Sequence, residues 1–170
     1  MTMNRYTLAV LVNNKFGVLN RVTSMFRRRQ FNINALTVSE TDDPTISRIT
    51  VVFEGTEIKK TQLIDQLVKL PDVRSTKETD PDNFISRELL LLKMENNPET
   101  RNDVMTAAGA FNATTVGYSR HTIMFQLCEE TRRIDDFVNL MREYNILEIC
   151  RTGSVSLEKG SKTISSAVKL

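Results

Sequence analysis

A strand-like run that leads directly into a helix-like run opens this sequence, and the same succession returns near its middle. In the first run the apolar residues alternate, as in a strand with one buried face, at Tyr6, Leu8, Val10 and Val12. From Gly17 the apolar residues take helical spacing, at Val18, Leu19, Val22, Met25 and Phe26. A strand followed at once by an amphipathic helix favours an α+β architecture, in which helices pack on a sheet.

The rest of the first half adds two strands, a helix and a weak fourth strand. Alternation predicts strands near residues 34–39 and 49–53, and the turn-forming run 41–45 between them predicts a hairpin. A helix is expected around residues 63–68, where the apolar residues share one face, and Pro71 bars its continuation. Residues 73–79 then complete the order βαββαβ.

After the polar run 80–83 the pattern restarts, so we place a domain boundary there. Strands are predicted at residues 89–94, 114–118, 123–127 and 146–152, and helices at 104–111 and 134–141. We therefore predict two tandem ferredoxin-like βαββαβ domains, residues 1–80 and 81–170, with a short tail from residue 153 that is ordered only where it docks. Right-handed crossovers place both helices on one face of each four-stranded antiparallel sheet.

This arrangement leaves the second face of each sheet without helices. The first strand carries apolar residues on both sides, so its bare face should pack against something. A second copy of the chain is the simplest expectation.

Composition excludes several classes of protein. Apolar residues make up 40% and charged residues 26%, as in globular proteins, and a net charge of +2 gives no footprint for nucleic acid or an acidic membrane. The short apolar run before Asn13 is neither a signal peptide nor a membrane span. Only Cys128 and Cys150 are present, without CxxC spacing, so we expect reduced core cysteines and a cytoplasmic location.

The first candidate site is the turn between the first strand and the first helix. A helix start offers unpaired N–H groups to a carboxylate, here at Gly17, Val18 and Leu19, and Gly17 permits close approach. Asn14 both donates and accepts hydrogen bonds, so it could hold the ammonium and carboxylate of an amino acid together. The alternative is an ordinary turn in which Asn and Gly only cap the helix.

The second candidate is Asn32 with Ile33, at the entry to the second strand. If this strand lies beside the first, Asn32 comes near the Asn14 turn of the same chain or of a partner. An asparagine pair around a helix start suits a zwitterionic amino acid. The alternative is that Asn32 and Asn34 are loop residues that bond their own backbone.

We find no catalytic or metal-binding constellation in the sequence. His121 is the only histidine and falls in a predicted hairpin turn, facing solvent. No zinc spacing, nucleophile elbow, phosphate loop or dinucleotide fingerprint is present. RNA binding by the sheet is disfavoured because the third strand is aliphatic where bases would stack, and Arg27, Arg28 and Arg29 suit a helix end.

These residues carry a family resemblance. The succession of a strand, Asn14-x-x-Gly17-Val18-Leu19, an amphipathic helix and Asn32-Ile33 resembles the ACT domain, an amino-acid-sensing module. The run from Thr41 to Arg48 narrows this to the small subunit of acetolactate synthase (acetohydroxyacid synthase). The second half is similar too, with Arg87-Glu88-Leu89 opening a strand and Glu148-x-x-Arg151-Thr152-Gly153 closing the last one.

The resemblance implies a regulatory subunit without catalytic residues of its own. It would activate a large subunit that holds thiamine diphosphate, Mg²⁺ and FAD and that condenses pyruvate, alone or with 2-ketobutyrate, in branched-chain amino acid biosynthesis. Valine would bind between two ACT domains of a homodimer, at Asn14, Gly17, Val18, Leu19, Asn32 and Ile33. The second domain would support the large subunit.

Two other classes of function stay open at this point. A stand-alone amino-acid sensor or transcription co-regulator would use the same turn, and a purely structural scaffold would bind no amino acid. One departure from the family pattern is Gln30, because relatives often have Gly between the first helix and the Asn-Ile strand. Gly tolerates the left-handed backbone of a helix end, so Gln30 implies either slight strain or a different helix end.

Overall fold

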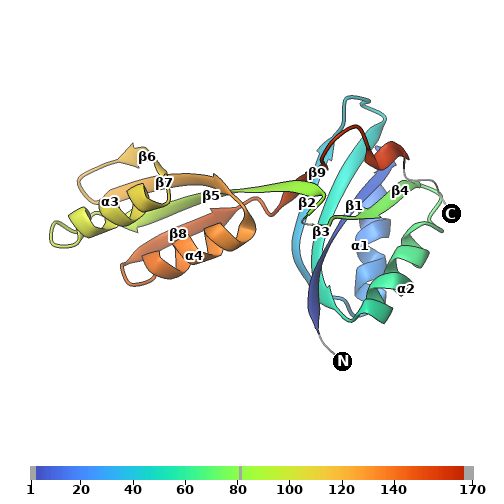
Figure 1. The fold of residues 1–170 in the computed structure, drawn as a ribbon, viewed down its shortest axis with the longest axis horizontal. Coiled ribbons are helices and arrows are strands. Elements are labelled where there is room, and N and C mark those ends of the chain that lie inside the picture. The colour runs from blue at the N-terminus through green and yellow to red at the C-terminus, as the bar shows by residue number, and fades with distance from the viewer. Residues whose placement is uncertain (1–2, 81, 167–170) are drawn as a thin grey trace. The chain divides into compact units, whose positions relative to one another are not determined.

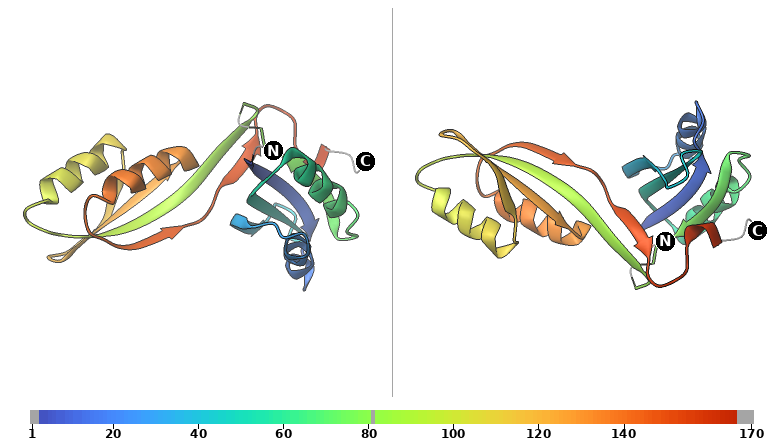
Figure 2. Two further views of the ribbon diagram at one scale, coloured as in Figure 1. Left: turned by 90° about the horizontal axis from the view of Figure 1, so that it is seen from below. Right: turned by 90° about the horizontal axis from the view of Figure 1, so that it is seen from above.

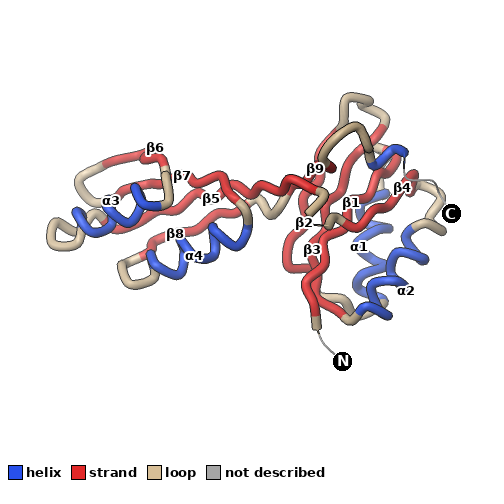
Figure 3. Tube along the Cα trace, in the orientation of Figure 1, coloured by secondary structure: helices blue, strands red, loops and turns tan. Residues whose placement is uncertain are grey.

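A computed structural model of the chain describes residues 3–80 and 82–166. The chain divides into two compact units, one formed by residues through Ile85 together with those from Val155 onward, the other by Ser86–Ser154. Each unit is a sheet backed by two helices (Figures 1 and 3). The division differs from the expected domains 1–80 and 81–170, because the residues from Val155 onward pack with the first unit.

The first unit has the predicted βαββαβ order. Its elements are β1 (Asn4–Asn13), α1 (Val18–Arg28), β2 (Ile33–Glu40), β3 (Ile46–Gly55), α2 (Glu57–Leu67) and β4 (Val73–Glu78). The sheet is antiparallel with strand order β2-β3-β1-β4, so β2 is an edge strand and β3 separates it from β1. The expectation that the second strand lies beside the first is therefore wrong.

The core of this unit lies between the sheet and its two helices, which share one face. Alternate residues of β1 enter it, and α1 contributes Val18, Val22, Met25 and Phe26. Phe26, Phe31 and Phe53 meet edge to face, with ring centroids 5.3–6.2 Å apart. Leu19 is 41% exposed, so it departs from the buried stripe that its spacing predicts.

The chain's own C-terminal segment covers part of the opposite face, where we expected a second copy. Ile164, in the short helix η1 (Ile164–Ser166), packs with Ala9, Leu11 and Ile46. The preceding strand β9 (Val155–Glu158) pairs with β5, and its Ser156 carbonyl accepts a 2.6 Å hydrogen bond from the Arg48 guanidinium. The red segment in Figures 1 and 2 is this C-terminal stretch.

Helix α1 is flanked on both sides by a residue with left-handed backbone. Gly17 at its N-terminus has φ 80°, and Gln30 just beyond its C-terminus has φ 57°. The Gln30 amide donates to the Arg27 carbonyl and the Phe31 amide to the Phe26 carbonyl, the hydrogen-bond pair of a Schellman motif. Gln30 thus adopts the conformation usually given to glycine and accepts the strain.

The second unit repeats the order with a longer first strand. Its elements are β5 (Phe84–Glu95), α3 (Arg101–Ala110), β6 (Thr114–Tyr118), β7 (Thr122–Glu129), α4 (Thr131–Met141) and β8 (Ile146–Arg151). Strand order is β6-β7-β5-β8, and an apolar core fills the space between this sheet and α3 and α4. His121 is exposed in the β6–β7 turn as predicted, whereas Cys128 and Cys150 are exposed rather than buried.

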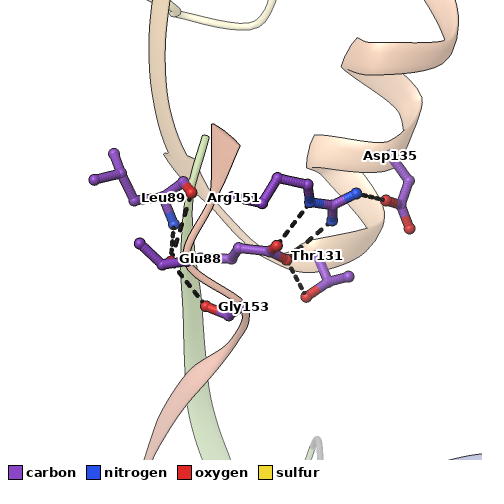
Figure 4. A network of polar contacts seen from close by, with 7 residues as sticks. Glu88, Leu89, Thr131, Asp135, Arg151 and Gly153 are labelled. Carbon is purple, nitrogen blue, oxygen red and sulfur yellow. Dashed lines mark hydrogen bonds and ion pairs between the residues drawn. The ribbon is translucent and has the colours of Figure 1, made fainter. Parts of the chain in front are cut away.

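A buried carboxylate ties β5, α4 and β8 together in this unit (Figure 4). The Glu88 carboxylate is only 4% exposed. It accepts hydrogen bonds from Arg151 Nε at 2.7 Å, from Arg151 Nη2 at 3.0 Å and from the Thr131 hydroxyl at 2.8 Å. Arg151 also reaches Asp135 at 2.7 Å. Hydrogen bonding to Glu88, opposed by burial, raises the pKa of Arg151. The two sequence motifs of the second half meet in this pair.

Within residues 3–80 and 82–166, none of the helices has the length and apolar character that crossing a membrane requires.

The two ends of α1 predict opposite responses to substitution. Gly17→Ala should destabilise the first unit by about 1 kcal/mol, because left-handed backbone strains any residue with a Cβ even though no atom lies within 4 Å of that Cβ. Gln30→Gly should stabilise it by about 0.5–1 kcal/mol, since it removes that strain at a small entropic cost. Urea unfolding of both variants checks this, and the same sign for both would contradict it.

The Glu88–Arg151 pair should matter far more than an exposed pair on the same strand. Arg151→Met leaves a buried carboxylate without its cation, so we expect a loss of about 3 kcal/mol. Lys93→Met breaks a 2.6 Å pair with exposed Glu148 and should cost less than about 1 kcal/mol. Hydrogen exchange of the β5 and α4 amides measures the stability of the second unit separately from that of the first. Equal effects would show that Glu88 does not depend on Arg151.

Candidate functional site

The site begins where β1 ends, and Asn13 anchors that end. Its backbone amide donates to the Asp72 carbonyl at 2.8 Å, and its side-chain oxygen accepts Arg74 Nε at 2.8 Å. Arg21, on α1, pairs with the Asp72 carboxylate at 2.6 Å. Asn13 therefore has a structural role, and it fixes the position from which the next residue projects.

Asn14 is held by the β2–β3 hairpin through both its backbone and its side chain. Its backbone amide donates to the Thr45 carbonyl at 2.7 Å. Its side-chain nitrogen donates to Glu40 Oε1 and to the Pro44 carbonyl, both at 2.9 Å. Asn14 thus does not cap α1, whereas Gly17 does, as the alternative of an ordinary capping turn expects of the glycine.

The hairpin turn that holds Asn14 is itself strongly ordered. The Asp43 carboxylate accepts hydrogen bonds from the Thr45 amide at 2.8 Å and the Thr45 hydroxyl at 2.7 Å. These bonds, the hydroxyl first, hold the pKa of Asp43 below its ordinary value. The Thr41 hydroxyl and amide both bond to the Ile46 carbonyl, which closes the turn. Asn14 therefore rests on a rigid support.

The start of α1 lies three residues after Asn14 and presents main-chain donors. Gly17 caps the helix without any side-chain hydrogen bond, so the first-turn amides have no capping side chain. Val18 is buried in the core and its amide donates to the Lys15 carbonyl at 3.2 Å, so neither its side chain nor its amide is available to a ligand. Leu19 is half-exposed and Phe16 is fully exposed beside it in sequence.

Asn32 and Ile33 lie at the other end of the sheet. Ile33 pairs with Phe53, which pairs with Tyr6, whereas Asn13 pairs with Ile46 at the opposite end. The seven steps from Tyr6 to Asn13 span roughly 23 Å at about 3.3 Å each. Asn32 therefore does not come near the Asn14 of its own chain, and only the expectation of a partner's Asn14 remains.

The Asn14 turn is an open surface in a single chain. Asn14, Leu19 and Asn32 are all exposed, while Ile33 is partly buried against the core. A depression of about 530 Å³ lies elsewhere on the first unit, near Phe84 and Glu158. Lys77, which lines this depression, already forms an ion pair with Glu158 at 2.5 Å, so we assign the depression no ligand.

In the part of the chain that the structure describes, no group of three His, Cys, Asp or Glu side chains could hold a metal ion. The single histidine is exposed, and its backbone amide donates to the Ser119 hydroxyl at 3.3 Å while its carbonyl accepts from the Asn96 amide at 2.9 Å. The ion pair of the buried Glu88 carboxylate with Arg151 links core elements of the second unit. The Asn14 turn is thus the best candidate site in both sequence and structure.

Sequence reasoning missed two residues of this site, Glu40 and Pro44. Glu40 and Pro44 lie 26 and 30 residues after Asn14 in the sequence, so no local sequence pattern predicts these hydrogen bonds. The run 41–48 predicts a turn and carries the family resemblance, but nothing in it indicates that this turn supports Asn14.

The sequence matches two family descriptions in succession. Residues 8–75 match the "AHAS small subunit-like ACT domain", and residues 87–160 match the "Small subunit of acetolactate synthase". A protein of Archaeoglobus fulgidus named probable acetolactate synthase small subunit is 39% identical over 93% of this chain and 99% of that protein. The acetolactate synthase small subunit of Mycolicibacterium smegmatis is 35% identical over 95% of both chains.

A solved structure agrees with the sequence matches. The acetolactate synthase small subunit of Thermotoga maritima has a TM-score of 0.84 and 28% identity, covering 94% of this chain and 99% of that one. The fold, both halves of the sequence and nearly the full length of the relatives thus agree, which confirms the predicted two-domain α+β fold and its ACT domain. This chain belongs to the family of acetolactate synthase small subunits, the regulatory subunits of that enzyme.

Proposed function

We propose that this chain binds valine between the first units of two copies and thereby inhibits a thiamine-diphosphate-dependent large subunit that it otherwise activates. Membership of the small-subunit family supports the regulatory role. Asn14 and Asn32 support the shared site, because they are exposed polar residues at opposite ends of one sheet. In this proposal thiamine diphosphate, Mg²⁺ and FAD belong to the large subunit, and the complex is cytoplasmic.

The edge strand β2 provides the geometry for joining two copies. Among the strands of residues 3–80 and 82–166 it pairs with β3 alone, so its outer edge can accept another strand. Antiparallel pairing of β2 with β2 of a second copy about a two-fold axis sets the start of one strand against the end of the other. Asn32 of one copy then lies beside Glu40, the residue that holds Asn14, in the other.

The groups brought together this way fit an α-amino acid. The first-turn amides of α1 after Val18, beginning with Leu19, suit a carboxylate, since they carry the positive end of the helix dipole. The side-chain oxygen of Asn14 accepts a hydrogen bond from an ammonium group. Leu19 and Val38, each 41% exposed, offer apolar surface to a small branched side chain. Valine has all three parts.

Inhibition requires only that valine bind one arrangement of the holoenzyme better than another. A coupling free energy of about 1–3 kcal/mol is typical for such effects and changes affinity several-fold or more. A ligand that bridges two copies supplies this preference directly, because it binds only when the two half-sites are aligned.

Substitution of Asn14 tests the effector site in the holoenzyme. Asn14→Ala should abolish inhibition by valine while the stimulation of the large subunit persists, because the core and the second unit are untouched. Activity of the reconstituted holoenzyme, with and without valine, measures both effects. Full valine sensitivity in this variant would contradict the proposed site.

Mixed dimers test whether the site is shared. Asn14→Ala and Asn32→Ala homodimers should each fail to bind valine, since each lacks one half of both sites. A mixed dimer of the two variants keeps one intact site, so co-refolding them should restore binding to part of the population. Calorimetry with valine measures the recovered stoichiometry. Absence of any recovery, with mixed dimers present, would show that the two residues do not share a site.

A further inference from the structure

The orientation of the Asn14 amide follows from its two partners. A carboxylate and a backbone carbonyl only accept hydrogen bonds, and both lie 2.9 Å from the same atom of the Asn14 side chain. That atom must therefore be the nitrogen, which has two hydrogens to donate. Both hydrogens are used within the chain, so Asn14 offers a ligand its oxygen alone. The expectation that Asn14 also donates to a ligand does not fit this arrangement.

The support beneath this amide is unequal on its two sides. Pro44 contributes a backbone carbonyl within a turn that Asp43 and Thr41 hold in place. Glu40 contributes a carboxylate at the end of an edge strand, and it is the only side chain that accepts from Asn14 among the described residues. A charged acceptor makes a stronger hydrogen bond than a neutral one, so Glu40 contributes more than Pro44 to the preference for this amide orientation.

We propose that Glu40 is a positioning residue that holds the Asn14 oxygen toward the ligand and so makes the site select an α-ammonium group over a 2-oxo group. This rests on the proposed amino-acid site. The first-turn amides of α1 after Val18 offer donors to a carboxylate, and the Asn14 oxygen offers an acceptor. The site therefore has a fixed polarity that matches a zwitterion in one direction only.

The fixed polarity of the site disfavours the 2-oxo acid that most resembles valine. Valine and 3-methyl-2-oxobutanoate share a carboxylate and a branched side chain, but the oxo acid has a carbonyl oxygen where valine has an ammonium. Two oxygens then face each other without a hydrogen atom between them, and the hydrogen bond is lost. The substrates of the proposed large subunit are themselves 2-oxo acids, so this selection keeps the regulatory site free of substrate.

Paired substitutions at Glu40 separate positioning from direct contact. Glu40→Gln retains an acceptor oxygen for the Asn14 amide, so valine affinity should stay within about twofold of the unchanged protein. Glu40→Ala removes the stronger of the two acceptors and leaves the Pro44 carbonyl alone to hold the amide nitrogen. The preference for the nitrogen-inward orientation therefore weakens, and valine affinity should fall about tenfold. The preference for valine over 3-methyl-2-oxobutanoate should fall with it. Glu148→Ala, which removes an exposed hydrogen-bonded carboxylate of the second unit, is the control and should change neither value.

Calorimetry of the full chain with valine and with 3-methyl-2-oxobutanoate measures these affinities. Equal losses in Glu40→Gln and Glu40→Ala would overturn the inference, because they would mean that the Glu40 charge contacts the ligand itself. Unchanged selectivity in Glu40→Ala would overturn it too, since the amide would then be held without Glu40.

A ligand-free measurement keeps this inference distinct from the proposed function. In the unliganded protein the side-chain amide NMR signals of Asn14 should shift in Glu40→Ala and stay in place in Glu40→Gln. If the unchanged protein binds no valine, the proposed effector is wrong, and the NMR comparison still decides whether Glu40 orients Asn14. Identical Asn14 signals in all three proteins would show that it does not.

Discussion

The central position of β1 in the first sheet determines how every part of the regulatory site is placed. β1 pairs with β3 on one side and β4 on the other, so β2 is left at the edge. Its two faces are both buried, one under α1 and α2 and the other partly under Ile164. The turn after β1 therefore leaves a rigid strand and meets the β2–β3 hairpin at the same end of the sheet. Asn14 is fixed by this meeting, and Asn32 is placed at the far end by the same topology.

Residue patterns predicted the elements well because burial on one face imposes a period on each of them. The same patterns do not encode which strands are neighbours, so the expectation that Asn32 approaches Asn14 within one chain was wrong. The stretch 155–166 has few apolar residues, and its strand exists through partners far away in sequence, such as Arg48. Cys128 and Cys150 lie in strands as expected, but their side chains are on the sheet face that lacks helices and are exposed. Strand order and long-range partners are tertiary information.

Gln30 occupies a position whose left-handed backbone favours glycine, and the helix end forms there nonetheless. Its position after α1 takes a left-handed backbone, and the two hydrogen bonds of the Schellman motif form as they would with glycine. The strain is of order 1 kcal/mol, small beside the burial of the neighbouring Phe26 and Phe31 rings. Packing on both sides of the turn therefore imposes the conformation. This helix end leads into Asn32, so its geometry is preserved where the proposed site needs it.

The selectivity of the proposed site depends on its closure. An unpaired acceptor costs little while water can reach it, and in a single chain Asn14 is exposed. If a second copy covers the turn, the Asn14 oxygen loses water, and a ligand without a donor leaves it unsatisfied at a larger cost. Association of two copies and discrimination between valine and 2-oxo acids are then one event. Valine would favour the closed arrangement because it satisfies both half-sites, whereas an oxo acid would satisfy only the amides of α1. The orientation of one side-chain amide would thereby connect ligand chemistry to the quaternary state of the enzyme.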